Sequence, residues 1–129
     1  MGKEIHSEIQ KLHFFRPYFA KEYGVDEAIM FNNLIYWIAT NSMNNNNHHD
    51  GRWWTFNSAE NFKKYFDYWS TSQIRRILKS LVKQGAIIEG NYNKHKYDRT
   101  KWYALKKEQY ILENFNPVNE IETWKKRYR

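Results

Sequence analysis

The sequence predicts a mostly helical α+β domain, and three observations indicate that class. Apolar residues recur at helical spacing in residues 70–85, a stretch whose other face is basic. Two short apolar runs, 86–90 and 100–105, flank a polar segment, as the strands of a β-hairpin do. Aromatic residues make up 19% of the 129 residues, which is enough for a core rich in rings. We therefore expect one domain over residues 1–129, with its core at about 14–105 and a C-terminal helical extension at 106–129.

The stretch 70–85 has the pattern of an amphipathic helix with both ends encoded. Ser70 and Gln73 have the spacing of a capping box, and Gly85 supplies the residue that most easily adopts the left-handed conformation at a helix end. The apolar stripe occupies positions i, i+3, i+4, i+7 and i+8, and consists of Ile74, Ile77, Leu78, Leu81 and Val82. Since the stretch contains no carboxylate, its outward face is positive throughout.

Two helices are expected before this stretch. Aromatic spacing predicts a short helix within 14–23, with Pro17 in its first turn and Gly24 at its end. Asp26 then caps a longer helix over about 27–42. Apolar residues cover most of the circumference of that helix, so we expect it to be the central helix of the core.

The middle of the chain is expected to be a loop, a strand and a helix. The Asn-rich segment 41–52 is of low complexity and predicts a flexible connection with a poorly ordered tip. Residues 53–56 predict a short strand, and Asn57 with Glu60 opens a helix over 58–66. A turn of about three residues then leads into the amphipathic helix, as in a helix-turn-helix.

The second half of the predicted domain is a hairpin followed by a helix. In the return strand, Trp102 and Ala104 alternate with Tyr103 and Leu105. The basic residues of the hairpin tip form a basic wing and are Lys94, His95, Lys96, Arg99 and Lys101. One more helix is expected over about 106–115, and Pro117 separates it from a last amphipathic piece around Ile121 and Trp124.

The positive charge of the chain is concentrated in one third of its length. The net charge is +7, and residues 70–105 alone carry eight basic and two acidic side chains, which gives +6. Solubilising charge tends to be scattered, whereas a block on a folded element creates a local field suited to a polyanion. The expected partner is therefore a nucleic acid.

The sequence lacks the residues that several other classes of protein need. The chain has no cysteine for a disulfide or a thiolate zinc site, and no apolar run long enough to span a membrane. Its five glycines stand apart, so no phosphate-cradling loop is present. His48 and His49 are adjacent, without further ligands at workable spacing for a metal. We expect no enzyme, no cofactor and no metal.

The predicted order of elements is that of a winged helix, in which a helix enters the major groove and the hairpin reaches the adjacent backbone. Four stretches carry a closer resemblance: GVDEAIMFNNLIYWI, GRWWTFNSAENFKKYF, YWSTSQIRRILKSLVKQGAII and NKHKYDRTKWYAL. Together they resemble the winged-helix domain of bacteriophage and prophage replication proteins, the DnaD-like and replisome-organiser group. This resemblance covers about residues 14–105.

The resemblance implies a protein that binds DNA and helps to start replication in a phage or mobile element, in the cytoplasm at the nucleoid. It places Trp53 on the first strand, and Ser70, Arg75, Arg76 and Leu81 on the recognition helix. It places Asp98, Arg99, Thr100, Trp102 and Tyr103 on the return strand of the wing. The chain departs from the group in its Asn-rich connection and in having little room for a helicase-recruiting domain.

The candidate DNA-binding residues divide by chemistry. Arginines near the helix start suit guanine edges and Gln73 suits adenine, whereas Lys79, Lys83 and the wing lysines suit phosphates. The full set is Thr71, Ser72, Gln73, Arg75, Arg76, Lys79, Lys83, Lys94, Lys96, Arg99 and Lys101. A solvated helix face, a wing whose lysines only block edge aggregation and an Asp98–Arg99 pair stay open as simpler interpretations.

Other roles also stay open at this point. Transcription regulators use the same groove chemistry, and a protein-interaction module is an alternative from another class. A homodimer and replication proteins of the host are further candidate partners. Single-strand stacking is an alternative for the tryptophans, although most of them, including Trp37, Trp54 and Trp102, are expected to face the core; Tyr92 and Tyr97 suit it better.

Overall fold

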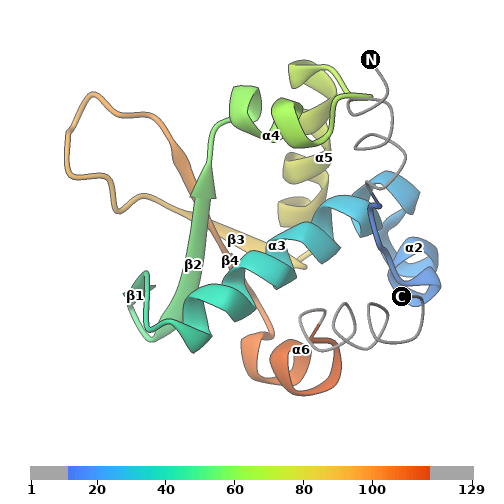
Figure 1. Ribbon diagram of the computed structural model, residues 1–129, viewed down its shortest axis with the longest axis horizontal. Coiled ribbons are helices and arrows are strands. Elements are labelled where there is room, and N and C mark those ends of the chain that lie inside the picture. Colours follow the sequence, from blue (N-terminus) through green and yellow to red (C-terminus); the bar gives the residue numbers. More distant parts are fainter. Residues whose placement is uncertain (1–11, 117–129) are drawn as a thin grey trace, which may run out of the picture.

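The computed structural model describes residues 12–116, and these form an α+β arrangement of five helices and a small antiparallel sheet (Figure 1). The helices are α2 (Pro17–Tyr23), α3 (Val25–Met43), α4 (Ala59–Tyr65), α5 (Thr71–Lys83) and α6 (Glu108–Asn114). The strands are β1 (His48–His49), β2 (Arg52–Asn57), β3 (Ile87–Gly90) and β4 (Lys101–Leu105). The expected piece around Ile121 and Trp124 lies outside the described residues.

The sheet has the order β1-β2-β4-β3, and every neighbouring pair is antiparallel. β4 is therefore central, between β2, which precedes the two short helices, and β3, which follows them. Its register pairs Trp102 with Phe56 on one side, and Ala104 with Ile88 on the other. The long loop between β3 and β4 projects away from the helices (Figure 1).

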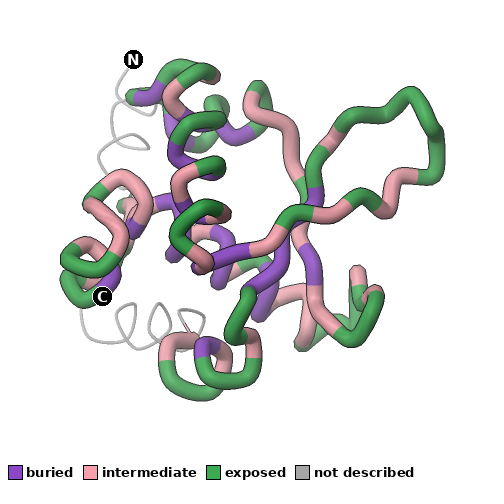
Figure 2. The backbone as a smooth tube through the Cα atoms, turned by 180° about the vertical axis from the view of Figure 1, so that it is seen from behind, coloured by how far each residue is buried: buried purple, intermediate pink, exposed green. Residues whose placement is uncertain are grey.

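The main core lies between the helices and one face of this sheet. Phe31, Leu34 and Ile35 of α3 are essentially fully buried and belong to one cluster with Leu81 of α5 and Leu105 of β4. The buried backbone segments lie where these elements cross (Figure 2). The expectation that α3 is the central core helix is confirmed.

The opposite face of the sheet carries a second, smaller aromatic cluster. Trp54, Trp102 and Ala104 are buried there, and Ile88 and Tyr92 pack against them. Tyr103 and Leu105 belong to the main core instead. The alternation in the return strand is thus confirmed, and both faces of β4 are covered.

The Asn-rich segment is not the flexible connection that its composition predicted. α3 continues to Met43, and β1 pairs with β2 in a two-residue hairpin that opposes His49 to Arg52. Asp50 and Gly51 occupy its turn with φ values of +52° and +75°, as a type I′ turn requires at both central positions. The turn chemistry of Asp-Gly therefore overrides the low-complexity interpretation.

Two predicted caps are also wrong. Asp26 lies inside the first turn of α3, whose N-cap is Gly24 without a side-chain hydrogen bond. The N-cap of α4 is Ser58 rather than Asn57, and its Oγ accepts from the Asn61 N–H at 3.1 Å. Asn57 ends β2 and accepts from the Ser58 N–H, so the cap lies one residue further along the chain.

Candidate nucleic-acid interface

Helix α5 is fixed at both ends by local hydrogen bonds. Ser70 Oγ accepts from the Gln73 N–H at 3.1 Å, and Gln73 Oε1 accepts from the Ser70 N–H at 2.8 Å, which completes the predicted capping box. At the other end Gly85 has φ +79°, its N–H donates to Val82, and the Ala86 N–H donates to Leu81. These two bonds form a Schellman motif. The predicted ends of the helix are confirmed.

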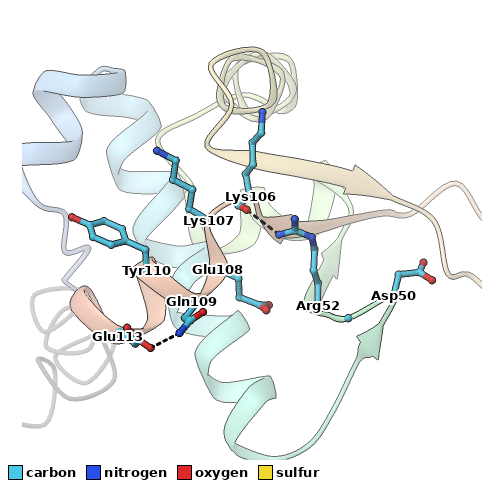
Figure 3. Close-up of a pocket in the computed structure, with 9 residues that line it drawn as sticks. Asp50, Arg52, Lys106, Lys107, Glu108, Gln109, Tyr110 and Glu113 are labelled. Carbon is cyan, nitrogen blue, oxygen red and sulfur yellow. Dashed lines mark hydrogen bonds between the residues drawn. The ribbon is translucent and has the colours of Figure 1, made fainter.

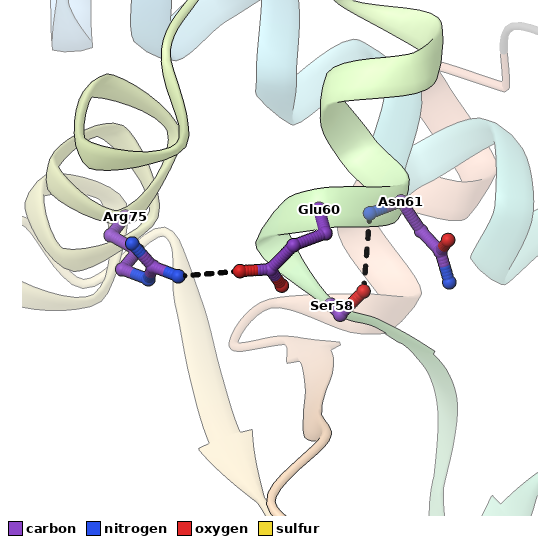
Figure 4. Close-up of polar contacts among 4 residues, drawn as sticks. All are labelled: Ser58, Glu60, Asn61 and Arg75. Carbon is purple, nitrogen blue, oxygen red and sulfur yellow. Dashed lines mark hydrogen bonds and ion pairs between the residues drawn. The ribbon is translucent and has the colours of Figure 1, made fainter.

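The outward face of α5 carries cations that differ in their partners. Arg76, Lys79 and Lys83 are exposed, and no carboxylate within residues 12–116 forms an ion pair with them. Arg75, by contrast, donates from Nη2 to Glu60 Oε1 at 2.8 Å (Figure 4). Gln73 already uses its side-chain oxygen in the cap, so the capping bond competes with bidentate contact with adenine.

A groove of about 880 Å³ lies between α5, the start of α4 and the base of the wing. Arg75 and Lys79 line it from the helix, and Arg99 and Lys101 line it from the end of the wing loop and from β4. Four candidate residues from two distant segments thus share one surface depression. The other candidates do not line it: Thr71, Ser72, Gln73, Arg76, Lys83, Lys94 and Lys96.

The groove also contains acidic side chains, which the charge count of the sequence did not place there. Glu60, Glu89 and Asp98 line it together with the four cations. Glu89 Oε1 lies 3.4 Å from Lys101 Nζ. The lining of the groove therefore has four basic and three acidic side chains and is close to neutral.

Asp98 is engaged within the wing. Its Oδ1 accepts from the Thr100 N–H at 2.9 Å, and this hydrogen bond lowers the pKa of the Asp98 carboxyl. No Asp98–Arg99 ion pair is among the contacts of the described residues. Asp98 thus shapes the turn of the wing.

The wing is anchored to the outer face of the sheet, which sequence reasoning missed. Asn93 accepts from Trp102 Nε1 at 2.6 Å and donates to the carbonyl oxygens of Asp98 and Thr100 at 2.9 and 2.8 Å. Tyr92 donates to Asp50. These bonds connect both ends of the loop to the sheet and to the β1–β2 turn.

The β1–β2 hairpin completes this anchor. The rings of Tyr92 and His49 stack with their centroids 4.4 Å apart and an interplanar angle of 9°. Trp54 Nε1 donates to the His49 carbonyl at 2.8 Å. The only available signal in the sequence was Asp-Gly between two short aromatic runs, which is a hairpin signature.

Trp37 was expected to face the core, and this is wrong. It is 47% exposed, and with Phe56, which is 48% exposed, it lines a depression of about 310 Å³ at the end of β2. Of the two wing tyrosines, Tyr97 is 84% exposed and Tyr92 is packed against the sheet.

A third depression lies between the start of α6 and the β1–β2 turn (Figure 3). Arg52 lines it, but its guanidinium donates to the carbonyl oxygens of Leu105 and Lys106 at 2.5 and 3.0 Å. Glu108 accepts from the Trp53 N–H at 2.6 Å. These side chains hold α6 to the sheet, and we assign them a structural role.

Comparison of the chain with protein-family models, with curated proteins and with solved structures gave no match. The resemblance to phage replication proteins therefore stays a prediction from the sequence motifs. Within residues 12–116, no group of three or more His, Cys, Asp or Glu side chains is arranged to hold a metal ion. In that part of the chain no helix has the length and apolarity needed to cross a membrane.

Proposed function

We propose that this chain is a winged-helix domain that binds double-stranded DNA through α5 and the wing. The observation that carries the proposal is the groove that Arg75 and Lys79 share with Arg99 and Lys101. In a winged helix, the second helix of the helix-turn-helix enters the major groove and the hairpin contacts the adjacent backbone. The antiparallel pairing of β2 with β4 and of β4 with β3 is compatible with this topology, and the base of the wing, at Arg99 and Lys101, borders the same groove as α5.

The proposed binding divides between positions around the groove and positions in it. Four exposed cations do not line the groove: Arg76, Lys83, Lys94 and Lys96. In the proposed complex they contact phosphates of the duplex. Lys79 lines the groove without an ion pair to any described carboxylate. We assign these cations to phosphates, and Arg75 to base edges.

The test is a titration of duplex DNA at several salt concentrations. Five phosphate contacts predict a slope of about −4 to −5 in log affinity against log salt. The double variant Arg76→Glu with Lys79→Glu should lower the affinity at least about 100-fold at low salt, since it removes two contacts and adds two repulsive charges.

The matched control changes the same charges elsewhere. Lys21 on α2 and Lys107 before α6 are exposed and lie away from the groove. Lys21→Glu with Lys107→Glu alters the net charge equally, so it should retain most of the affinity. If both double variants lose affinity equally, or if the slope is flat, the proposed interface is wrong.

We further propose that the DNA bound lies at a replication start of a phage or mobile element, as the sequence resemblance implies. Transcription regulation is the alternative role with the same chemistry. Recovery of the DNA that the protein binds in cells carrying such an element distinguishes them. Enrichment at the start of replication supports the first role, and enrichment at promoters alone supports the second.

A further inference from the structure

The acidic side chains in the groove do not fit a surface that only gathers phosphates. Glu60, Glu89 and Asp98 lie among the cations that would face the duplex. Each carboxylate repels phosphate, so it weakens binding that depends on the backbone alone. Base edges are different, because they present hydrogen-bond donors as well as acceptors. The composition of the groove therefore favours contact with bases.

The Glu60–Arg75 pair is the most specific feature of this groove. Glu60 stands in the first turn of α4, and Ser58 caps that turn through the Asn61 N–H (Figure 4). The Glu60 carboxylate contacts Arg75 on α5, with Glu60 Oε1 lying 2.8 Å from Arg75 Nη2. The two side chains are 65% and 58% exposed, and exposed pairs contribute little to stability. Removal of either side chain should therefore leave the fold largely intact.

The contact restricts the guanidinium group of Arg75 without using all its donors. Glu60 accepts one N–H from Nη2, and the remaining four N–H groups stay available for another acceptor. A flexible arginine loses rotamer freedom when it binds, and a held arginine loses less. Bidentate contact with guanine O6 and N7 needs a guanidinium plane in a defined orientation.

We propose that Arg75 reads a G·C base pair and that Glu60 is its positioning residue, so that the protein recognises its duplex by base sequence. This inference rests on the proposed DNA binding and specifies that the binding depends on base sequence. Glu60 has a second effect in this account, because its charge weakens binding to duplexes that offer only phosphates at that place.

The experiment begins with selection of bound duplexes from a randomised pool, followed by affinity measurements on the selected duplex and on a scrambled one. The unmodified chain should prefer the selected duplex at least about tenfold, with a G·C pair at one position. Glu60→Ala should reduce that preference about tenfold and should raise the affinity for the scrambled duplex.

Further variants separate positioning from charge. Arg75→Ala should lose the preference at the same base pair, and Glu60→Ala combined with Arg75→Ala should lose no more, because the two residues act as one unit. Glu89→Ala removes a groove carboxylate that contacts Lys101 instead, so it should raise scrambled affinity and keep the preference. Glu113→Ala, on the exposed side of α6, should change neither.

The outcomes distinguish this inference from the proposed function. If the chain binds duplex DNA with the expected salt slope but selection enriches no sequence, the inference is overturned and DNA binding stands. The inference is also overturned if Glu60→Ala keeps the full preference for the selected duplex. It is overturned as well if the double variant loses more of this preference than Arg75→Ala alone. If the chain binds no duplex at all, both are overturned. Circular dichroism on each variant establishes that the helical content of the chain is unchanged.

Discussion

Helices α3 and α5 pack against each other, but they are held in place in different ways. α3 has eight buried residues and no side-chain hydrogen bond at either cap. α5 buries four residues on one stripe and is closed at its ends by the Ser70–Gln73 capping box and the Gly85 turn. Burial on most sides holds α3 in place. Hydrogen bonds at its two ends help to hold α5 in place, so its outer face can remain exposed for a ligand.

The largest effect is expected in the core contact of α3. Phe31 is 1% exposed. Its ring packs edge-to-face on the rings of Phe19 and Tyr23, with distances between ring centroids of 4.9 and 5.5 Å. Phe31→Ala should lower the free energy of unfolding by about 3–5 kcal/mol, since it leaves a cavity among rings. Urea unfolding followed by circular dichroism measures it. Arg76→Ala on α5 should change stability by less than about 0.5 kcal/mol, and a similar loss in both variants would remove the contrast between the helices.

The comparison extends to the wing, which is the second element proposed to contact DNA and is held to the sheet through Asn93. Asn93→Ala should cost about 1–3 kcal/mol, because it leaves the buried Trp102 Nε1–H without its acceptor. The wing would also lose its bonds to Asp98 and Thr100. Tryptophan fluorescence reports the change, with Lys94→Ala, on the exposed part of the loop, as the control. An unfolding curve identical to that of the unmodified chain would mean that the wing is not held by this residue.

Removal of the α5 cap should have a smaller effect. Ser70→Ala is expected to lower stability by about 1 kcal/mol, since it removes the acceptor for the Gln73 N–H. Asp26→Ala in α3 is the matched control, because Asp26 makes no cap there; it should cost no more than about 0.5 kcal/mol through the helix dipole. Equal losses in thermal unfolding would contradict the difference between the two helices.

An effect of similar size, confined to alkaline solution, is expected for a buried tyrosine. Burial, and then the charge of Glu89, raise the pKa of Tyr103 in the folded chain. The unfolded chain therefore loses this proton first, so the contribution of Tyr103 is fully present below pH about 10 and is lost above it. Tyr103→Phe should reduce the fall in stability between pH 8 and pH 11 by about 1 kcal/mol.

Tyr68 is a second tyrosine that titrates in this way. Burial, and then the charges of Tyr65, Asp26 and Asp67, raise its pKa to about 12. Tyr110 is 55% exposed, whereas Tyr103 is 3% exposed. Tyr110→Phe is therefore the control for the alkaline measurement, and an equal effect of Tyr110→Phe and Tyr103→Phe would contradict the assignment to burial.

The sequence predicted those parts of the fold that depend on neighbouring residues. The capping box, the Gly85 turn and the alternation around Trp102 are local patterns, and each has a physical cause within a few residues. The prediction failed for the Asn-rich segment, because composition was given more weight than the Asp50–Gly51 turn. It also failed for Trp37, since periodicity in a mostly apolar helix does not say which side remains uncovered.

The candidate site was predictable only as a set of charges. The basic stripe on α5 follows from helical spacing, and the wing follows from the hairpin pattern. The Glu60–Arg75 contact joins residues 15 apart on different helices, and the Asn93–Trp102 bond depends on how the wing folds back. Such contacts are set by tertiary packing, so no local pattern in the sequence encodes them.

The most direct test of the account is an NMR titration of the isotope-labelled chain with a duplex, followed residue by residue. We predict that backbone amides of α5 and of the wing loop shift together in a single binding event, while those of α2 and α6 stay in place. Shifts confined to α2 and α6, or shifts of α5 without the wing, would contradict the claim that helix and hairpin form one surface for DNA.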